Sequence, residues 1–505
     1  MKNFSSPGVL FRICLIAPAV VAVFSFLTVA LSRVAFPFAL EWLEAGTYTH
    51  VARVLEGKPI YAAPSYEFIA MIYPPLYYYV AAPLAGLTGN IMLSIHLVSM
   101  GSALAAFLLL YGICRVRRLP RSLSFLAVGF AAASYKATGF WFDIGRVDML
   151  FMALLLAAVL LVTLRPRREG VTGVAAGVAL ALAFATKQQA VVALPFLVFV
   201  LLLERRWKKA LAFAGSAALL MALFVWGLAA ASENWFLFYV FTLPGSAPAS
   251  AAWFADTWRI LLWPAFWPLV ALILLGVTLA LLGNHRRDNL PRLVSLALLV
   301  LPLLLMSYLS LAKQWGYVNG FLPAAFGLAL AGAEAVFYAM QIPLTPRWVR
   351  AVVLGLALAL VWLQFGVSRY DPRTQIPSAA NVTAGYQALD TINHAPAPIF
   401  APTDSYLLDM IGQPMHFQAS ALSDITLAAR YNPKVEDVLN RYQAGISGPY
   451  LRGNAAAAVL AEPNWYREVF NEENGYTCES LTDDGEMLVT MTGAKHALGE
   501  LCVLH

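Results

Sequence analysis

The chain of 505 residues has few charges, only 4 cysteines and no recognisable phosphate-binding or metal-binding motif. Only 12% of its residues are charged, whereas an average soluble domain carries about 25%. That shortage excludes an ordinary soluble enzyme. No glycine-rich phosphate loop and no cysteine–histidine spacing of the kind that binds zinc occurs, so neither site is predicted.

Hydrophobic residues, at 60% of the total, fill the chain instead. A helix needs about 20 apolar residues to cross a bilayer core of about 30 Å. We predict a polytopic α-helical membrane protein with about eleven transmembrane helices. The first run is too long for the core of a signal peptide and is interpreted as a retained span. The predicted spans are 8–32, 92–114, 122–141, 147–164, 171–186, 189–204, 209–231, 258–283, 293–312, 319–342 and 349–367.

The basic residues lie in short clusters between alternate pairs of spans, which is the pattern of cytoplasmic loops. The net charge of +6 therefore does not indicate a nucleic-acid partner. We predict a bacterial cell-membrane protein with a cytoplasmic N-terminus and with its last span exiting outward. The clusters are Lys2/Arg12, Arg115/Arg117/Arg118/Arg121, Arg165/Arg167/Arg168, Arg205/Arg206/Lys208/Lys209, Arg286/Arg287/Arg292 and Arg347/Arg350.

Two domains follow from this topology: a transmembrane module over residues 1–367 and an extracytoplasmic soluble α/β domain over 368–505, where polar residues increase. The first external loop covers about 33–91. Its apolar segment 69–89 is interpreted as an interfacial helix, with its tyrosines at the level of the headgroups. The alternative, in which 69–89 spans and the N-terminus lies outside, would put every later basic cluster outside.

Polar side chains collect at the predicted outer ends of the spans, where ionisable groups are functional candidates. Carboxylates are candidate general bases and cations are candidate phosphate ligands. Simpler explanations exist for several of them: Arg146 and Asp148 as a structural ion pair, Lys187 extending to the interface, and Asp143 as a capping residue. Cys478 and Cys502 lie in the external domain and are a disulfide candidate, with two separate thiols as the alternative.

The first external loop resembles that of the GT-C superfamily of glycosyltransferases. The nearest families are the protein O-mannosyltransferases, the aminoarabinose transferases and the RgtA/B/C/D-like enzymes. These carry Asp-Glu, a Tyr four residues after the Asp, often an Arg nine after it, and then a Pro-Pro-Leu stretch. Glu44, Tyr48 and Arg53 keep that spacing, and "YPPLYYY" (73–79) follows. Ala45 stands where those families have the second acid, and Glu41 lies one helical turn earlier.

The resemblance implies an inverting glycosyltransferase that moves a sugar from a polyprenyl-phosphate donor to an extracytoplasmic hydroxyl of a glycolipid, polysaccharide or protein. It makes Glu44 the expected base, with Glu41 as its helper on one helical face. The expected donor-phosphate ligands are Arg146, Lys187, Lys313, Arg53 and Tyr73. The expected substrate-binding residues are Tyr48, Tyr61, Asp143, Asp148, Gln188 and Asn319. No cofactor is required, and binding of Mg²⁺ or Mn²⁺ is left open.

Three other functional classes stay open at this stage, one of them a different membrane enzyme such as an O-antigen-ligase-like transferase or a phosphotransferase. A transporter or flippase also combines many spans with buried charges, although no inverted internal repeat is visible. A non-catalytic subunit with the same fold would explain the altered acidic pair. The sequence identifies neither the sugar nor the acceptor.

Overall fold

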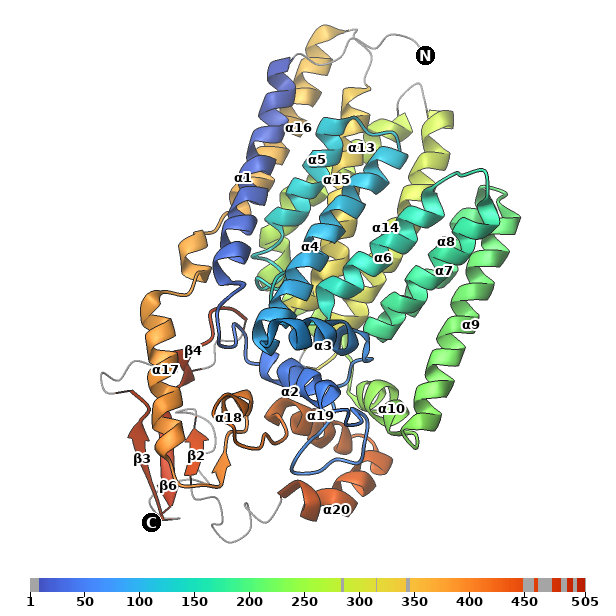
Figure 1. The fold of residues 1–505 in the computed structure, drawn as a ribbon. Coiled ribbons are helices and arrows are strands. Elements are labelled where there is room, and N and C mark those ends of the chain that lie inside the picture. The colour runs from blue at the N-terminus through green and yellow to red at the C-terminus, as the bar shows by residue number, and fades with distance from the viewer. Residues whose placement is uncertain are drawn as a thin grey trace.

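The computed structural model describes residues 9–282, 286–314, 316–341, 346–447, 458–461, 475–482, 488–493 and 497–504. Long helices stand side by side in a bundle, with α1 and α16 adjacent at one edge (Figure 1). The C-terminal helices and strands gather at one end of this bundle, together with the short helices α2 and α3. The chain is an integral membrane protein with many apolar helices.

Each predicted span corresponds to a helix. Eight helical stretches among the described residues are long and apolar enough to cross a membrane, and shorter apolar helices accompany them. α5, α6 and α8 are among the shorter ones. The helices are α1 (Val9–Arg33), α4 (Ile91–Val116), α5 (Arg121–Ala133), α6 (Asp148–Thr163), α7 (Glu169–Thr186), α8 (Ala193–Leu203), α9 (Trp207–Ala231), α13 (Trp263–Leu282), α14 (Arg286–Leu311), α15 (Leu322–Met340) and α16 (Arg347–Val367).

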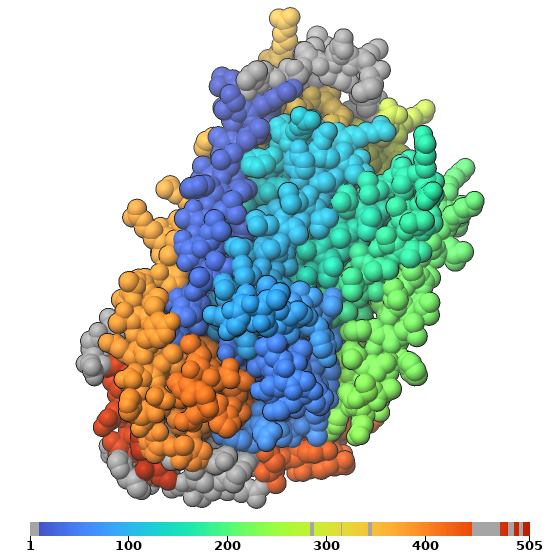
Figure 2. All heavy atoms as spheres, viewed as in Figure 1, coloured from blue at the N-terminus to red at the C-terminus, as the bar shows by residue number. Residues whose placement is uncertain are grey.

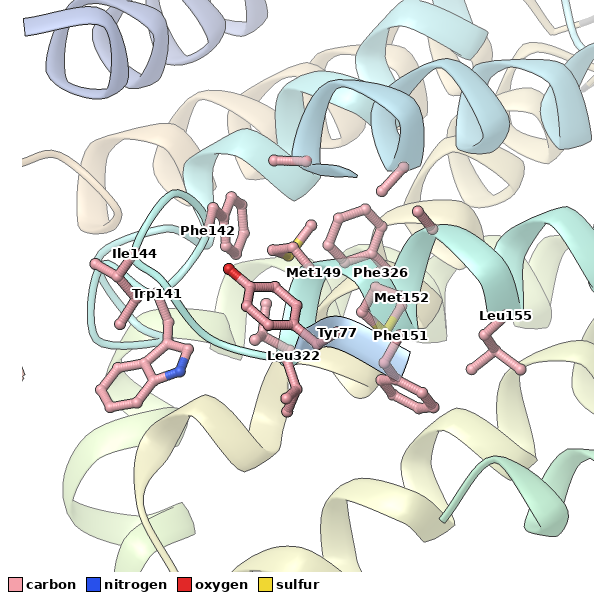
Figure 3. Close-up of a cluster of buried hydrophobic side chains, with 14 of the residues drawn as sticks. Tyr77, Trp141, Phe142, Ile144, Met149, Phe151, Met152, Leu155, Leu322 and Phe326 are labelled. Atoms are coloured by element: carbon pink, nitrogen blue, oxygen red, sulfur yellow. The ribbon is translucent and has the colours of Figure 1, made fainter. Parts of the chain in front are cut away.

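The predicted span 122–141 is too long, because α5 ends at Ala133. An irregular segment follows and includes Gly139 and Phe140, both with positive φ, so the helix does not continue there. This segment then runs into α6 and packs over a buried cluster that includes Phe142, Met149 and Phe326 (Figure 3). The packing holds the segment at the end of the bundle, where α6 begins.

The first external loop contains α2 (Glu44–Leu55) and α3 (Leu76–Thr88). With 13 residues at 1.5 Å each, α3 is about 20 Å long, too short to cross a bilayer. The prediction that the tyrosines form an interfacial belt is wrong for two of them. Tyr77 and Tyr78 are buried, and the Tyr77 hydroxyl donates to the Ile95 carbonyl at 2.7 Å. Tyr79 alone of the three is exposed.

The second external loop is largely helical. It carries α10 (Trp235–Leu237), η2 (Phe238–Thr242), α11 (Leu243–Ser246), α12 (Ala251–Thr257) and η3 (Trp258–Leu262) before α13. η2 and η3 are π-helical turns, a rare form that often occurs at functional sites. Short 3₁₀ turns also precede α8 and α15, namely η1 (Gln188–Val192) and η4 (Val318–Phe321).

The C-terminal segment mixes helices with a small sheet of strand order β1-β2-β6-β3. β1 and β2 are parallel and the other pairs are antiparallel. Cys478 of β3 and Cys502 of β6 form a disulfide. The predicted boundary falls where α16 ends, and the division into two domains stays a prediction. The elements are η5 (Pro372–Gln375), α17 (Ala379–His394), α18 (Tyr406–Met410), α19 (Ala419–Ala429), α20 (Pro433–Ser447), β1 (Ile399–Phe400), β2 (Ala458–Ala461), β3 (Tyr476–Ser480), β4 (Leu488–Val489), β5 (Ala497–Leu498) and β6 (Glu500–Leu504).

This C-terminal segment packs directly on the first external loop (Figure 2). The Tyr406 hydroxyl accepts a hydrogen bond from the backbone of Ala39 at 3.1 Å. Phe38 lies against the Tyr386 ring and so close to Gly385 that a Cβ there would sit 2.1 Å from the Phe38 ring. The loop that carries Glu41 and Glu44 is thus held from the C-terminal side as well as by the bundle.

Candidate active site

A cavity of about 640 Å³ lies at the end of the bundle where α2 and the C-terminal helices meet it. Segments far apart in the sequence form its walls: the start of the first loop, the end of α7 with η1, η2 with α11, the end of α14, and α19. Its polar residues are Glu41, Tyr73, Arg146, Lys187, Gln188, Gln189, Ser310, Lys313, Gln314, Tyr317, Asn319, Ser420, Ser423 and Asp424.

Glu44, the first residue of α2, is buried and its carboxylate is fully occupied. One oxygen, Oε2, accepts from the backbone N–H of Leu40 at 2.5 Å and from that of Glu41 at 3.3 Å. The other, Oε1, accepts from the Gly145 N–H and lies 3.1 Å from His96 Nε2. Burial raises the pKa of Glu44, but His96 and these hydrogen bonds outweigh it, so the pKa lies below its usual value.

Glu41 differs from Glu44 in its position, its hydrogen bonds and the direction of its pKa shift. It precedes α2 instead of sharing a helical face with Glu44, and it lines the cavity. Its Oε2 accepts from the Leu43 N–H at 2.8 Å, while its buried Oε1 has no hydrogen-bond partner among the described residues. Burial raises the pKa of Glu41 to about 8, although Arg146 opposes this. A carboxylate that has one oxygen without a hydrogen-bond partner and a pKa near neutrality is suited to accept a proton.

Arg146 is the best available cation of the cavity. Its side chain is 2% exposed and lies beside the Tyr73 ring, with 5.2 Å between the guanidinium carbon and the ring centroid. Nη1 donates to the Leu43 carbonyl at 3.2 Å and Nη2 to the Tyr73 hydroxyl at 3.3 Å, while Nε has no partner among the described residues. No carboxylate forms an ion pair with Arg146 in the described structure, so the charge is free to bind an anion.

Lys187 has a matched countercharge. Its Nζ lies 2.7 Å from Asp148 Oδ1, and both side chains are buried. Asp148 also accepts from the Trp141 indole at 2.9 Å and from the Asn319 amide at 3.4 Å. This group links the start of α6, the end of α7 and η4. The anticipated Arg146–Asp148 ion pair is therefore replaced by a Lys187–Asp148 pair.

Lys313 and Gln188 complete the polar wall. Lys313 follows α14 and lines the cavity, and its Nζ donates to the Pro244 carbonyl of α11. Gln188 donates to the carbonyls of Ile72 and Val240 at 3.2 and 3.0 Å, and its Oε1 has no partner among the described residues. Val240 belongs to the π-helical turn η2, whose loosened backbone leaves this carbonyl available.

The remainder of the cavity is apolar. Aliphatic and aromatic side chains from α7, η1, η2, α11, α14 and α19 form a continuous wall beside the charged groups. They are Phe184, Val191, Val192, Val240, Phe241, Leu243, Leu309 and Leu427. The cavity is therefore amphipathic, with a charged part and an apolar part, as a ligand with an ionic head and a hydrocarbon tail requires.

Several predicted site residues do not line the cavity. Arg53 lies over the Phe68 ring, 4.3 Å from its centroid, and donates to the Pro59 carbonyl at 2.6 Å. Asp143 pairs with Arg33 at 2.5 Å inside the bundle. These contacts join structural elements and leave no free group toward the cavity.

Two predicted tyrosines also serve packing. The Tyr48 hydroxyl donates to Asp409 at 2.7 Å and so ties α2 to α18. The Tyr61 hydroxyl donates to the Tyr73 carbonyl at 2.6 Å and so holds the backbone beside the cavity. Tyr73 itself does line the cavity, as predicted.

The sequence did not predict that the C-terminal segment contributes residues to the cavity. Ser420, Ser423 and Asp424 line the cavity from α19, in a segment interpreted only as part of a soluble domain. Their spacing of three and four residues in an otherwise apolar helix was the available signal. On the opposite side, a Cβ at Gly493 would lie 2.7 Å from the Glu41 Cγ, and the preceding Thr492 N–H donates to the Leu40 carbonyl at 3.1 Å.

Among the described residues, no cluster of metal ligands lies at the cavity. Within the described residues, the one group with metal-ligand spacing is Cys478, Glu500 and Cys502. Its two cysteines are joined in the disulfide, which removes the thiolates that a metal would need.

Comparison with known proteins gives a family match over part of the chain. Residues 71–308 match the family model "Glycosyltransferase family 87", a stretch that includes Tyr73, Arg146 and Lys187. This match agrees with the resemblance to glycosyltransferases noted in the sequence. A search of curated proteins found no match.

The fold is similar to that of crystal structures of ArnT from Cupriavidus metallidurans. The structure bound to undecaprenyl phosphate gives a TM-score of 0.58 at 13% identity, with 96% of this chain and 98% of that chain covered. The apo structure gives a TM-score of 0.59 at 13% identity, with 96% and 97% covered. At this identity the likeness concerns the fold.

Proposed function

We propose that the protein transfers a sugar from a polyprenyl-phosphate donor to a hydroxyl group of an extracytoplasmic glycan, lipid or protein, with Glu41 as the general base. The observation that carries this proposal is the composition of the cavity. It combines the Glu41 carboxylate, which has one oxygen without a hydrogen-bond partner, with Arg146, which forms no ion pair among the described residues, and with an apolar wall. The structural relative that was crystallised with undecaprenyl phosphate supports the class of donor.

Arg146 is the proposed principal ligand of the donor phosphate. It offers unsatisfied hydrogen-bonding capacity, and no carboxylate forms an ion pair with it in the described part of the chain. Lys313 would add a second charge, and Lys187, already paired with Asp148, would contribute less. The isoprenoid tail would follow the apolar wall of η1, η2 and α14. Such charge-assisted contacts to phosphate are each worth about 1.5–3 kcal/mol.

The proposed reaction is a direct displacement. Glu41 takes the proton of the acceptor hydroxyl while the acceptor oxygen bonds to the anomeric carbon. The bond between that carbon and the phosphate oxygen breaks, and polyprenyl phosphate leaves with the electron pair. The anomeric configuration inverts, and Glu41 then releases its proton to solvent. A well-placed base contributes about 10²–10⁴-fold to such a reaction.

Glu44 has a different proposed role from the one that the sequence resemblance suggested. Its two oxygens accept hydrogen bonds from the backbone N–H groups of Leu40 and Glu41 in the loop and of Gly145 in the segment before α6. It therefore fixes the shape of the loop and the direction of the Glu41 side chain. Dependence on Mg²⁺ or Mn²⁺ stays a prediction.

The topology that places the cavity on the outer side is also part of the proposal. A cysteine at Lys58, an exposed position in the first external loop, should react with a membrane-impermeant thiol reagent in intact cells. A cysteine at Arg167, in the loop between α6 and α7, should react only after permeabilisation. The reverse labelling would place the N-terminus outside.

The transfer itself is tested with purified protein in lipid nanodiscs. We expect the wild type to release undecaprenyl phosphate from an undecaprenyl-phosphate sugar when an extract of cell-envelope acceptors is present. Glu41→Gln should abolish this release, while the exposed control Glu56→Gln should retain it. Movement of lipid-linked sugar across the membrane without release of the phosphate would identify a transporter instead.

A further inference from the structure

The helix α19 presents a polar stripe to the cavity. Ser420, Ser423, Asp424 and Leu427 all line it, and their spacing puts them on one helical face. The residues on the rest of this helix are mostly Ala, Leu and Ile. α19 is therefore amphipathic, with its polar face toward the cavity.

Asp424 is the charged member of that stripe and lacks a partner. It is half-buried, and no hydrogen bond or ion pair joins it to another residue in the described part of the chain. Its electrostatic contact is with Arg146, and burial raises its pKa to about 7. Because this carboxylate faces the cavity and takes no donor from the described residues, a ligand in the cavity can supply donors to it.

Arg146 and Asp424 give the cavity one positive and one negative side chain. Arg146 attracts a phosphate, and Asp424 repels one and accepts hydrogen bonds from hydroxyl groups. A donor bound with its phosphate at Arg146 would keep that phosphate away from Asp424. Its sugar is then the part of the donor that has hydroxyls to offer to α19.

We propose that Asp424 recognises the transferred sugar, accepting hydrogen bonds from its hydroxyl groups. This rests on the proposed function of the cavity and deepens it. Asp424 lies outside residues 71–308, the part that matches the glycosyltransferase family model. Binding of the phosphate and recognition of the sugar are thus divided between the membrane bundle and the C-terminal segment.

The test compares lipids with and without a sugar. Wild type, Asp424→Ala, Asp424→Asn and the control Asp437→Asn would be placed in nanodiscs, the last because Asp437 is exposed on α20, away from the cavity. Affinity would be measured for undecaprenyl phosphate alone and for the same lipid carrying mannose, glucose, galactose or arabinose. Thermal midpoints would show that each variant is folded.

We expect Asp424→Ala to weaken binding of the preferred sugar-bearing lipid by about 10- to 100-fold, the effect of losing hydrogen bonds to a charged acceptor. Binding of undecaprenyl phosphate alone should be unchanged or tighter. Asp424→Asn should lie between wild type and Asp424→Ala, and Asp437→Asn should match wild type.

Three results would overturn the assignment of Asp424. They are an equal loss for both kinds of lipid, no loss for any sugar-bearing lipid, and a wild type that binds none of these more tightly than undecaprenyl phosphate. Failure of the proposed function gives a different result, because the wild type would then release no undecaprenyl phosphate in the transfer assay, whatever its affinities.

Discussion

Two buried clusters of charged groups, at opposite ends of the membrane bundle, make a useful comparison. At the end away from the cavity, Arg206 pairs with Glu169 at 2.8 Å and Glu204 at 3.1 Å, and it donates to the carbonyls at the end of α6. Lys209 donates to three carbonyls in the same place. Each cation is saturated, as expected for groups that cap a helix end.

The cavity end is built from similar residues but is left unsatisfied. Among the described residues, buried polar atoms without a partner include Glu41 Oε1, Arg146 Nε, Gln188 Oε1, Gln189 Nε2 and Gln314 Oε1, and all five residues line the cavity. Unpaired buried groups destabilise a fold. Their concentration around one cavity indicates that a ligand completes them, whereas the saturated cluster indicates a structural role.

Replacing Glu41 should produce the largest effect on function. Glu41→Gln keeps the shape of the side chain and removes the base, so the transfer rate should fall by about 10²–10⁴-fold while donor affinity is retained. Single-turnover release of undecaprenyl phosphate measures the rate. Glu44→Gln should instead lower the thermal midpoint, because the loop loses its anchor. Full activity of Glu41→Gln would assign the base elsewhere.

Replacing Arg206 should produce the largest effect on stability. Arg206→Ala leaves the carbonyls at the end of α6 and Glu169 without their partner. This should lower the free energy of unfolding by about 3 kcal/mol. Thermal unfolding in detergent would show it as a clear drop in the midpoint. Donor affinity of the folded fraction should not change, and a selective loss of affinity would contradict the structural role of this cluster.

Replacing Arg146 should instead lower donor affinity more than stability. Arg146→Ala removes the proposed phosphate ligand and should weaken binding of undecaprenyl phosphate by about 10- to 100-fold, since a charge-assisted contact is worth about 1.5–3 kcal/mol. Arg146→Lys keeps the charge without the planar fork and should recover part of the affinity. Unchanged affinity in Arg146→Ala would move the phosphate site to Lys313.

Gly493 offers a smaller effect at the junction of the two regions of the site. It has φ +74°, and a Cβ there would lie 2.7 Å from the Glu41 Cγ. Gly493→Ala should displace Glu41 and lower the transfer rate by about tenfold, corresponding to 1–2 kcal/mol of strain. The Michaelis constant for the donor should stay unchanged. A matching substitution at the exposed Gly412, which also has positive φ but nothing nearby, controls for backbone strain alone.

The pH dependence tests the same carboxylate without a substitution. Burial raises the pKa of Glu41 to about 8. Since the base acts only when deprotonated, transfer should rise about tenfold per pH unit below that value and level off above it. Rates under subsaturating donor between pH 6 and 9 would show this. A profile that is flat above pH 6 would mean that the carboxylate is already ionised.

The sequence predicted the membrane class and most helices, because apolar runs of sufficient length determine spans whatever their neighbours are. It was less exact where tertiary contacts decide. The run 122–141 is apolar throughout, but α5 ends at Ala133 because the next residues turn to pack over Phe326. Tyr77 was placed at the headgroups because its buried partners on α4 are distant in sequence.

Part of the site was also predictable. Glu41, Tyr73, Arg146, Lys187, Gln188, Lys313 and Asn319 were all predicted site residues and all line one cavity. The ranking of the two glutamates was not predictable, because it depends on which of them His96 and the Gly145 N–H occupy. Asp424 could not be assigned at all without knowing that α19 docks on the cavity.

By itself, the sequence determined that this protein crosses the membrane many times and concentrates its ionisable groups at the ends of its spans, since both follow from local composition and the cost of charge in lipid. The tertiary structure decided which of those groups are saturated and which stay open. That difference depends on partners brought together from distant segments, and hydrogen-bond satisfaction is a property of the folded neighbourhood.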